Sequence, residues 1–252
     1  SREREMKNFT YRTLTELRRG VEKLGARHVR LESDVVKVQE ALGRPVQVGT
    51  VRTGNSMAIH PMEGCDGRLD GAPDELTYRR YERFGRGGAK LIWFEATAVV
   101  QEGRANTRQL WITNENVGDF ARIHDLILRT HREEYGRDDD VLIPIQLTHS
   151  GRYSVPKRII AYNNPLIARK FNMPDDYPAI TDDELDRLPD AFLEGAKLAY
   201  AAGFRALDLK GTHGYLLSEL LGAKTRPGRY GGSLENRTRV IKEIFDRWKA
   251  EF

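Results

Sequence analysis

Strand-like and helix-like segments alternate four times along this chain after residue 54, and this alternation restricts the fold more than any other feature of the sequence. The strand candidates are residues 56–61, 90–100, 141–147 and 206–210, and the amphipathic helix candidates are residues 74–84, 116–135, 181–199 and 233–252. Strands separated by helices of this length predict a parallel sheet, because parallel neighbours need a long crossover between them. The predicted fold class is therefore α/β.

The number of strands narrows the choice among α/β folds. A closed TIM (β/α)8 barrel usually takes about 250 residues, and this chain has 252, but residues 57–252 contain only four β/α units. Four strands cannot close such a barrel, so the sequence predicts either an open sheet or about the first four units of a barrel. In the barrel interpretation, residues 1–53 are an N-terminal extension with a hairpin cap. Residues 54–252 are then the first half of the barrel, and its second half would follow residue 252.

Shorter patterns predict local detail. Thr13-Leu-Thr-Glu16 and Thr181-Asp-Asp-Glu184 are capping boxes, and each is expected to begin a helix. Residues 46–54 favour a short hairpin. Pro189 lies inside the helix that begins at Thr181, and because proline lacks an amide hydrogen we expect it to kink or restart that helix.

The charge and hydropathy patterns argue against a nucleic-acid or membrane protein. The 41 basic and 37 acidic residues are interleaved, so the net charge of +4 is not gathered into the patch that nucleic acid requires. The longest apolar runs, residues 91–94 and 141–145, fall far short of the ~20 residues of a membrane helix. The first seven residues include acids and no apolar core, so we expect no secretory or mitochondrial leader and a cytoplasmic location.

Three polar residues, Lys210, His213 and Tyr215, follow the fourth strand candidate where it gives way to a helix. The carboxyl ends of parallel strands are where α/β folds bind ligands and carry out catalysis. This cluster offers hydrogen-bond donors to a carbonyl oxygen and a phenol that can deliver a proton. On residue chemistry alone, a structural interpretation stands equal to the catalytic one, with His213 bound to backbone and Tyr215 packed under the helix.

Four blocks of sequence occur in an order that is typical of one enzyme family. They are Asn55-Ser-Met-Ala-Ile-His-Pro-Met-Glu63, then Glu95-Ala-Thr-Ala-Val99 with Glu102-Gly-Arg104, then Gln146-Leu-Thr-His-Ser-Gly-Arg152, and last Ala202-Gly-Phe204 with His213-Gly-Tyr-Leu-Leu217 and Arg229-Tyr-Gly-Gly-Ser-Leu-Glu-Asn-Arg237. Together they resemble the Old Yellow Enzyme family, the FMN-dependent NADH:flavin oxidoreductases. One block alone is a weak signal, but four blocks in order are highly specific.

The resemblance implies an eight-stranded barrel that binds FMN at its C-terminal face. By their match to the family motifs, Pro61, Met62 and Ala96 are expected to contact the flavin ring, and Gln146 to bind its pyrimidine edge. Arg237 is expected to lie beside flavin N1 and O2, where a permanent cation stabilises the reduced, anionic ring. Tyr215 matches the tyrosine that protonates the substrate carbon after hydride transfer from flavin N5.

Two residues depart from the family pattern. The family usually has His-x-x-His or His-x-x-Asn where this chain has Lys210-Gly-Thr-His213, and those residues clamp the activating carbonyl or phenolate oxygen of the substrate. Lys210 either clamps a carboxylate or another ligand, or forms an ion pair with Asp208 on the same face of the strand. Glu63 stands where the family has Thr or Cys, and its carboxylate opposes negative charge on the flavin unless Lys210 or His213 compensates it.

The expected activity is that of an ene-reductase, in which NADH or NADPH reduces the flavin and the flavin reduces an activated alkene or a related small-molecule acceptor. The alternatives are a flavin-dependent dehydrogenase or demethylase of an amine or betaine, and a non-catalytic half-barrel. No metal ion is expected, and a homo-oligomer is compatible with the sequence. The iron–sulfur cluster of some family members stays open, because its cysteine-rich region would lie beyond residue 252.

The remaining candidates favour structural roles. His60, His124 and His131 have no acidic partner at a ligand spacing, and His149 belongs to a family motif but is compatible with a role in shaping its loop. Cys65, the one cysteine, is expected to be a small buried residue rather than a redox thiol, and it excludes an internal disulfide.

Overall fold

In the computed structural model, which describes residues 10–252, the parallel strands lie side by side in chain order. β3 (Ala58–Ile59) pairs with β4 (Leu91–Ile92), and a second sheet contains β5 (Phe94–Ala98), β6 (Pro144–Thr148) and β7 (Ala206–Leu209) in that order. A parallel bridge between Leu91 and Leu142 links the two sheets. The predicted parallel α/β architecture is confirmed.

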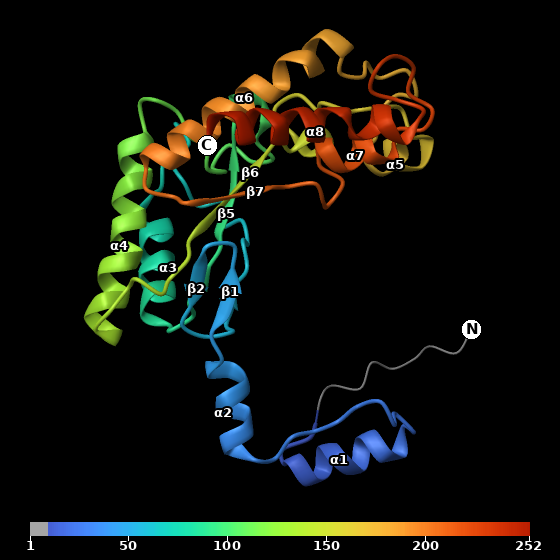
Figure 1. The fold of residues 1–252 in the computed structure, drawn as a ribbon. Coiled ribbons are helices and arrows are strands. Elements are labelled where there is room, and N and C mark those ends of the chain that lie inside the picture. Colours follow the sequence, from blue (N-terminus) through green and yellow to red (C-terminus); the bar gives the residue numbers. More distant parts are fainter. Residues whose placement is uncertain (1–9) are drawn as a thin grey trace.

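A single layer of helices covers this sheet (Figure 1). The helices are α3 (Glu75–Arg86), α4 (Val117–Tyr135), α6 (Asp182–Ala201) and α8 (Leu234–Glu251), and each packs against the next along the chain. A doubly wound sheet reverses its strand order and carries helices on both faces, whereas a β/α barrel keeps strands and helices in chain order. The described strands and helices therefore form a half-barrel, as the barrel interpretation of the sequence predicted.

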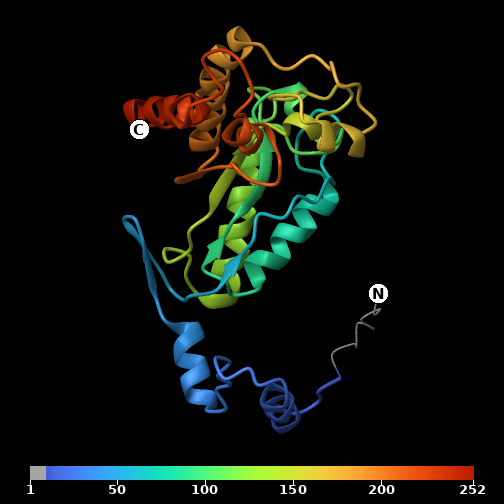
Figure 2. The ribbon, with the colours of Figure 1, turned by 90° about the vertical axis from the view of Figure 1, so that its right-hand side faces the viewer.

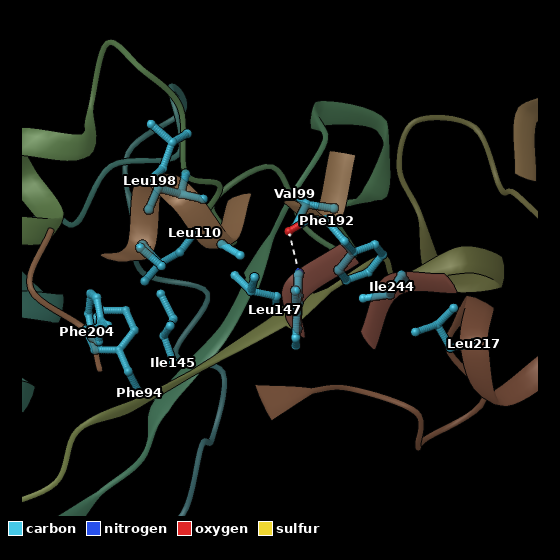
Figure 3. Packing of buried hydrophobic residues seen from close by; sticks show 14 of the residues in the cluster. Phe94, Val99, Leu110, Ile145, Leu147, Phe192, Leu198, Phe204, Leu217 and Ile244 are labelled. Carbon is cyan, nitrogen blue, oxygen red and sulfur yellow. Dashed lines mark hydrogen bonds between the residues drawn. The ribbon is translucent and has the colours of Figure 1, made fainter. Parts of the chain in front are cut away.

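The hydrophobic core lies between the strands and these helices (Figure 3). Ile145 and Leu147 of β6 are fully buried in it, and the rings of Phe94 and Phe204 meet edge to face with centroids 5.1 Å apart. Leu207 and Leu209 of β7 pack against the same cluster. Since side chains alternate along a strand, the residues between them point to the opposite, inner face of the sheet.

The predicted strand over residues 90–100 is interrupted at Trp93. β4 follows β3 on one side of the break, and β5 pairs with β6 beyond it, with a register shift between Phe94 and Thr97. The expected restart at Pro189 is wrong, because α6 runs through that residue as one helix. Two shorter helices, α2 (Val35–Gly43) and α5 (Pro165–Lys170), were not predicted from the sequence, whereas α7 (Leu216–Gly222) is the helix expected after Tyr215.

The N-terminal region precedes the half-barrel and forms its own small elements. α1 (Leu14–Lys23) begins at the predicted Thr13 capping box, and β1 (Val46–Val48) and β2 (Val51–Thr53) form the predicted antiparallel hairpin. Figures 1 and 2 show α1 and α2 extending away from the sheet and its helices. Within residues 10–252, no helix combines the length and apolar character of a membrane span. The leader prediction concerns residues 1–7, which lie outside the described residues.

Candidate active site

The turn after β7 brings two of the predicted catalytic residues to the sheet. His213 and Gly214 both adopt positive φ angles, 60° and 69°, so the chain reverses direction sharply before α7. The Leu216 amide at the start of α7 donates to the carbonyl of His149 after β6, at 3.2 Å. This bond fixes Tyr215, the N-cap residue of α7, near the carboxyl ends of both strands. Lys210 and Tyr215 are buried, whereas His213 is exposed.

The close approach of α7 to the loop after β6 depends on a glycine. Gly151 has a φ of 59°, and a Cβ atom there would lie 2.5 Å from the Leu216 amide nitrogen. Any larger residue would force the two segments apart, because contacts below 3.0 Å are not tolerated. The sequence motif around Gly151 therefore helps to place Tyr215.

Glu63 joins Lys210 and Tyr215 into a cluster on the inner side of the sheet. The Lys210 ammonium donates to Glu63 Oε1, and the Tyr215 hydroxyl lies 3.0 Å from Oε1 and 3.1 Å from Oε2 of the same carboxylate. The Lys210 Nζ also lies 4.1 Å from the centre of the Tyr215 ring, within range of a cation–π contact. We call these three residues the Glu63 cluster.

The electrostatics of this cluster keep the phenol protonated. Burial raises the pKa of Tyr215 far above its usual value, and the nearby Glu63 carboxylate raises it further. The same two causes, burial first, raise the pKa of the Cys65 thiol. A neutral phenol with a bound proton is the form that can act as a general acid. Cys65 stays a thiol, but it is half-buried rather than buried as predicted.

Glu63 is held in place by a buried ion pair beneath its loop. The Gly64 amide donates to Glu95 Oε2 at 2.8 Å, and Arg80 donates to Glu95 Oε1 at 2.7 Å. Arg80 also donates to Asp66 at 2.8 Å, so it ties both ends of the loop to β5. Neither the contribution of Arg80 nor that of Glu95 was predicted from the sequence. The available signal was a lone carboxylate inside the apolar run of residues 91–100.

The predicted alternative for Lys210, an ion pair with Asp208, is wrong. Asp208 instead accepts a hydrogen bond from Gln146 Nε2 at 2.5 Å, and these two residues are direct partners across β6 and β7. Lys210 reaches past Asp208 to the carboxylate of Glu63. The predicted compensation of the Glu63 charge therefore comes from Lys210 and not from His213, whose ring lies beside the hydroxyl of Thr212.

Of the residues expected around the flavin ring, some lie on the inner side of the sheet and one is buried within it. Pro61 and Met62 lie in the loop that also carries Glu63, with Pro61 half-buried and Met62 74% exposed. Gln146 lies on the inner face of β6, whereas Ala96 is fully buried in β5 and its carbonyl accepts from Gln109. The structure thus brings Pro61, Met62 and Gln146 to the side of the sheet that carries the Glu63 cluster.

Arg237 does not join this group. It lies in the first turns of α8, where its guanidinium donates to the carbonyl oxygens of Leu221 and Gly232. These bonds tie α8 to the last turn of α7 and to the loop between the two helices. The role beside flavin N1 and O2 that the resemblance implies for Arg237 stays a prediction.

His149 supports the loop after β6 rather than offering a free side chain. Its Nδ1 accepts from the Gly151 amide at 3.1 Å, and its ring lies against the backbone at Gly103. Burial lowers its pKa to about 4, so the ring is neutral at pH 7. His131 is likewise structural, with its two ring nitrogens bound to Lys90 and the Gly85 carbonyl.

We expect the stability of the protein to fall as the pH drops from 6.5 toward 4. Over that range the unfolded chain binds a proton at His149 that the folded chain does not, which costs the folded state about 3 kcal/mol. His149→Asn, which keeps an acceptor for the Gly151 amide, should flatten this part of the profile. Urea unfolding at a series of pH values measures it, with the exposed His28→Asn as control. Equal pH profiles for wild type and His149→Asn would contradict the assignment.

Two cavities lie away from the Glu63 cluster. One of about 570 Å³ lies beside Tyr162, Asp182 and Arg226, and one of about 590 Å³ lies between β7, α6 and α8. The inner face of a half-barrel is open rather than enclosed, so its functional side need not form a cavity. Geometry and charge, rather than hollow volume, identify the Glu63 cluster as the candidate site.

The half-barrel places a phenol, a cation and a carboxylate, those of Tyr215, Lys210 and Glu63, at the carboxyl ends of its strands. That face is where β/α barrels bind their ligands. Comparison with known proteins identifies the family within this class of barrels. Residues 41–251 match the NADH:flavin oxidoreductase / NADH oxidase family, and the chain belongs to that family. Its members use FMN with NADH or NADPH, as the resemblance implied.

Individual relatives agree with this assignment. A protein named NADPH dehydrogenase from a Geobacillus species is 32% identical over 214 residues, covering 83% of this chain and 59% of the relative. Another of that name from Clostridium acetobutylicum is 34% identical over 197 residues, covering 76% and 55%. The chain thus spans somewhat more than half the length of these relatives.

Solved structures confirm the fold. An Old Yellow Enzyme homologue from Zymomonas mobilis superposes with a TM-score of 0.67 at 25% identity, covering 83% of this chain and 60% of that one. A 2-naphthoyl-CoA reductase superposes with a TM-score of 0.71 at 18% identity, covering 84% of this chain and 34% of that one. The half-barrel therefore has the fold of part of an Old Yellow Enzyme barrel, 60% of the chain in the Zymomonas mobilis homologue.

The described residues fit the ring end of an FMN site. Met62 is exposed beside the Glu63 cluster, and its side chain offers apolar surface that a flat ring can cover. Gln146 is half-buried on the inner face, and because one hydrogen of its amide is bound to Asp208, its amide oxygen and second hydrogen are the groups that a ring edge could meet. Lys210 balances the Glu63 carboxylate, which would otherwise oppose charge on a reduced ring.

Proposed function

We propose that the whole protein, meaning a chain that carries these residues within a closed barrel, is an FMN-dependent NAD(P)H oxidoreductase that reduces an activated alkene or a related acceptor. FMN, when bound, would supply the hydride chemistry that links NAD(P)H to the acceptor. Pro61, Met62 and Gln146 would hold the ring. Tyr215 would donate its proton to the carbon next to the one that receives the hydride.

One observation carries this proposal: the Tyr215 hydroxyl is buried, protonated and located at the carboxyl ends of the strands. Lys210 beside it keeps a cation close to the reacting atoms, while Glu63 balances that cation. A positioned acid of this kind speeds proton transfer by about 10²- to 10⁴-fold. The same barrel also fits a dehydrogenase or demethylase of an amine or betaine, in which hydride runs in the other direction.

Anaerobic spectroscopy of the purified whole protein tests the proposal. We expect a flavin absorption band that NADPH or NADH bleaches and that an enone such as 2-cyclohexenone restores. Bleaching by a methylated amine or betaine, without a nicotinamide, would favour the alternative instead. A protein without flavin would contradict both enzymes and leave the non-catalytic scaffold.

A further inference from the structure

We propose that Glu63 acts as a built-in anion at this site, so that the site accepts neutral ligands and excludes carboxylates and phenolates. This inference rests on the proposed function, since it assumes that the acceptor binds beside Lys210 and Tyr215. It gives Glu63 a role in specificity. It also reverses the sequence-based expectation that Lys210 favours a carboxylate.

Both donors of the site already share one carboxylate. Lys210 and Tyr215 each contact Glu63, and the side chains of Lys210 and Glu63 are only 6% and 14% exposed. An anionic ligand that approached these donors would meet the Glu63 carboxylate at the same place. Like charges a few ångströms apart in a partly buried site repel strongly, so this arrangement selects against anions.

Glu63 is also not free to move aside. Its neighbour Gly64 is bound to Glu95, whose carboxylate is in turn held by Arg80. Glu95 is 1% exposed, so this anchor is inside the protein rather than on its surface. The backbone that carries Glu63 is therefore anchored, and moving the Glu63 carboxylate aside would require breaking its own contacts with Lys210 and Tyr215.

The charged groups around the Glu63 cluster also disfavour an anionic ligand. Glu63, Glu95 and Asp66 bring three carboxyl groups to this region, against the two cations Arg80 and Lys210. Burial is the main cause of the raised pKa of the Cys65 thiol, and the three carboxyl groups raise it further while Lys210 opposes them. A further negative charge from a ligand is disfavoured there.

A neutral carbonyl oxygen, in contrast, has a donor available. An ammonium group carries three hydrogens, and the contact with Glu63 uses one of those on Lys210. The others can serve the oxygen of a ketone, an aldehyde or an amide without displacing Glu63. The cluster therefore favours uncharged carbonyl compounds.

Two matched probes test this inference by equilibrium binding. Benzoate and benzamide have nearly the same shape but differ in charge, and calorimetry measures their binding to the whole protein without turnover. We expect the wild type to bind benzamide more tightly than benzoate. Glu63→Gln should raise the affinity for benzoate at least tenfold, because Lys210 then lacks its anion, and should change benzamide binding little.

Three control variants separate the charge of Glu63 from its size and from general changes in surface charge. Glu63→Asp, which keeps the charge, should exclude benzoate as the wild type does, and Glu75→Gln, at an exposed position of α3, should leave both affinities unchanged. In Glu63→Gln with Lys210→Met, the gain in benzoate affinity should disappear. Tighter binding of benzoate than of benzamide by the wild type would overturn the inference even if no variant folds.

The flavin spectrum separates this inference from the proposed function. Bound FMN that NADPH reduces, together with equal benzoate affinity in wild type and Glu63→Gln, would overturn the role of Glu63 alone. Absence of flavin would instead remove the proposed function on which that role depends.

Discussion

Replacing Tyr215 by Phe is expected to slow the oxidation of the reduced flavin by an enone by about 100- to 10,000-fold. Reduction of the flavin by NADPH should stay nearly unchanged. The variant keeps the ring, and with it the packing against Lys210 and Tyr153, and removes only the hydroxyl that lies within 3.1 Å of Glu63. Proton donation is needed only when the acceptor is reduced. Anaerobic stopped-flow spectroscopy of the whole protein measures the two half-reactions separately.

Tyr153→Phe is the matched control for this prediction. The Tyr153 ring centre lies 5.5 Å from that of Tyr215, in the same aromatic pair, but Glu63 accepts from Tyr215. Loss of the Tyr153 hydroxyl should leave both half-reactions close to the wild type. Equal slowing of both half-reactions in Tyr215→Phe would contradict the prediction, because the hydroxyl would then act in flavin reduction as well and not only as the proton donor to the acceptor.

The sequence predicted the architecture because the architecture depends on local periodicity. The long helices α4, α6 and α8 have apolar residues at helical spacing and polar caps, and the structure places all three within two residues of their predicted starts. The position of Tyr215 at the strand ends was predicted for a related reason. Its motif joins a strand to a helix, and such junctions bind ligands in parallel sheets.

The partner of Lys210 could not be predicted in this way. Alternation along β7 placed Asp208 on the same face, two residues away, and made it the natural candidate. Glu63 is 147 positions distant and reaches Lys210 only because the sheet brings the end of β3 close to the end of β7. The role of Arg80 was hidden for the same reason, since only the folded chain sets it against Glu95.

A polypeptide of these 252 residues alone is expected to bind FMN too weakly to detect and to self-associate. In β/α barrels the phosphate docks at loops after strands seven and eight. The described strands of this half-barrel correspond to the first four, with β4 and β5 as the two parts of one interrupted strand. Each charge-assisted hydrogen bond to the phosphate contributes about 1.5–3 kcal/mol, so losing several weakens binding by orders of magnitude.

The exposed edge of the sheet favours self-association. Among the described strands, β7 pairs only with β6, which leaves its other edge open. Beside this edge lies the groove of about 590 Å³ between β7, α6 and α8, which is lined mainly by apolar side chains, among them Phe204, Leu207 and Trp248. Open strand edges next to apolar surface are typical sites of association between chains.

Titrating FMN into residues 1–252, while light scattering follows the oligomeric state, tests most directly whether these strands are one half of a shared FMN site. We predict no saturable change in flavin fluorescence up to millimolar FMN, and scattering from dimers or larger species. Micromolar binding of FMN by a monodisperse monomer would contradict this prediction, because the four β/α units would then form a complete flavin-binding fold by themselves.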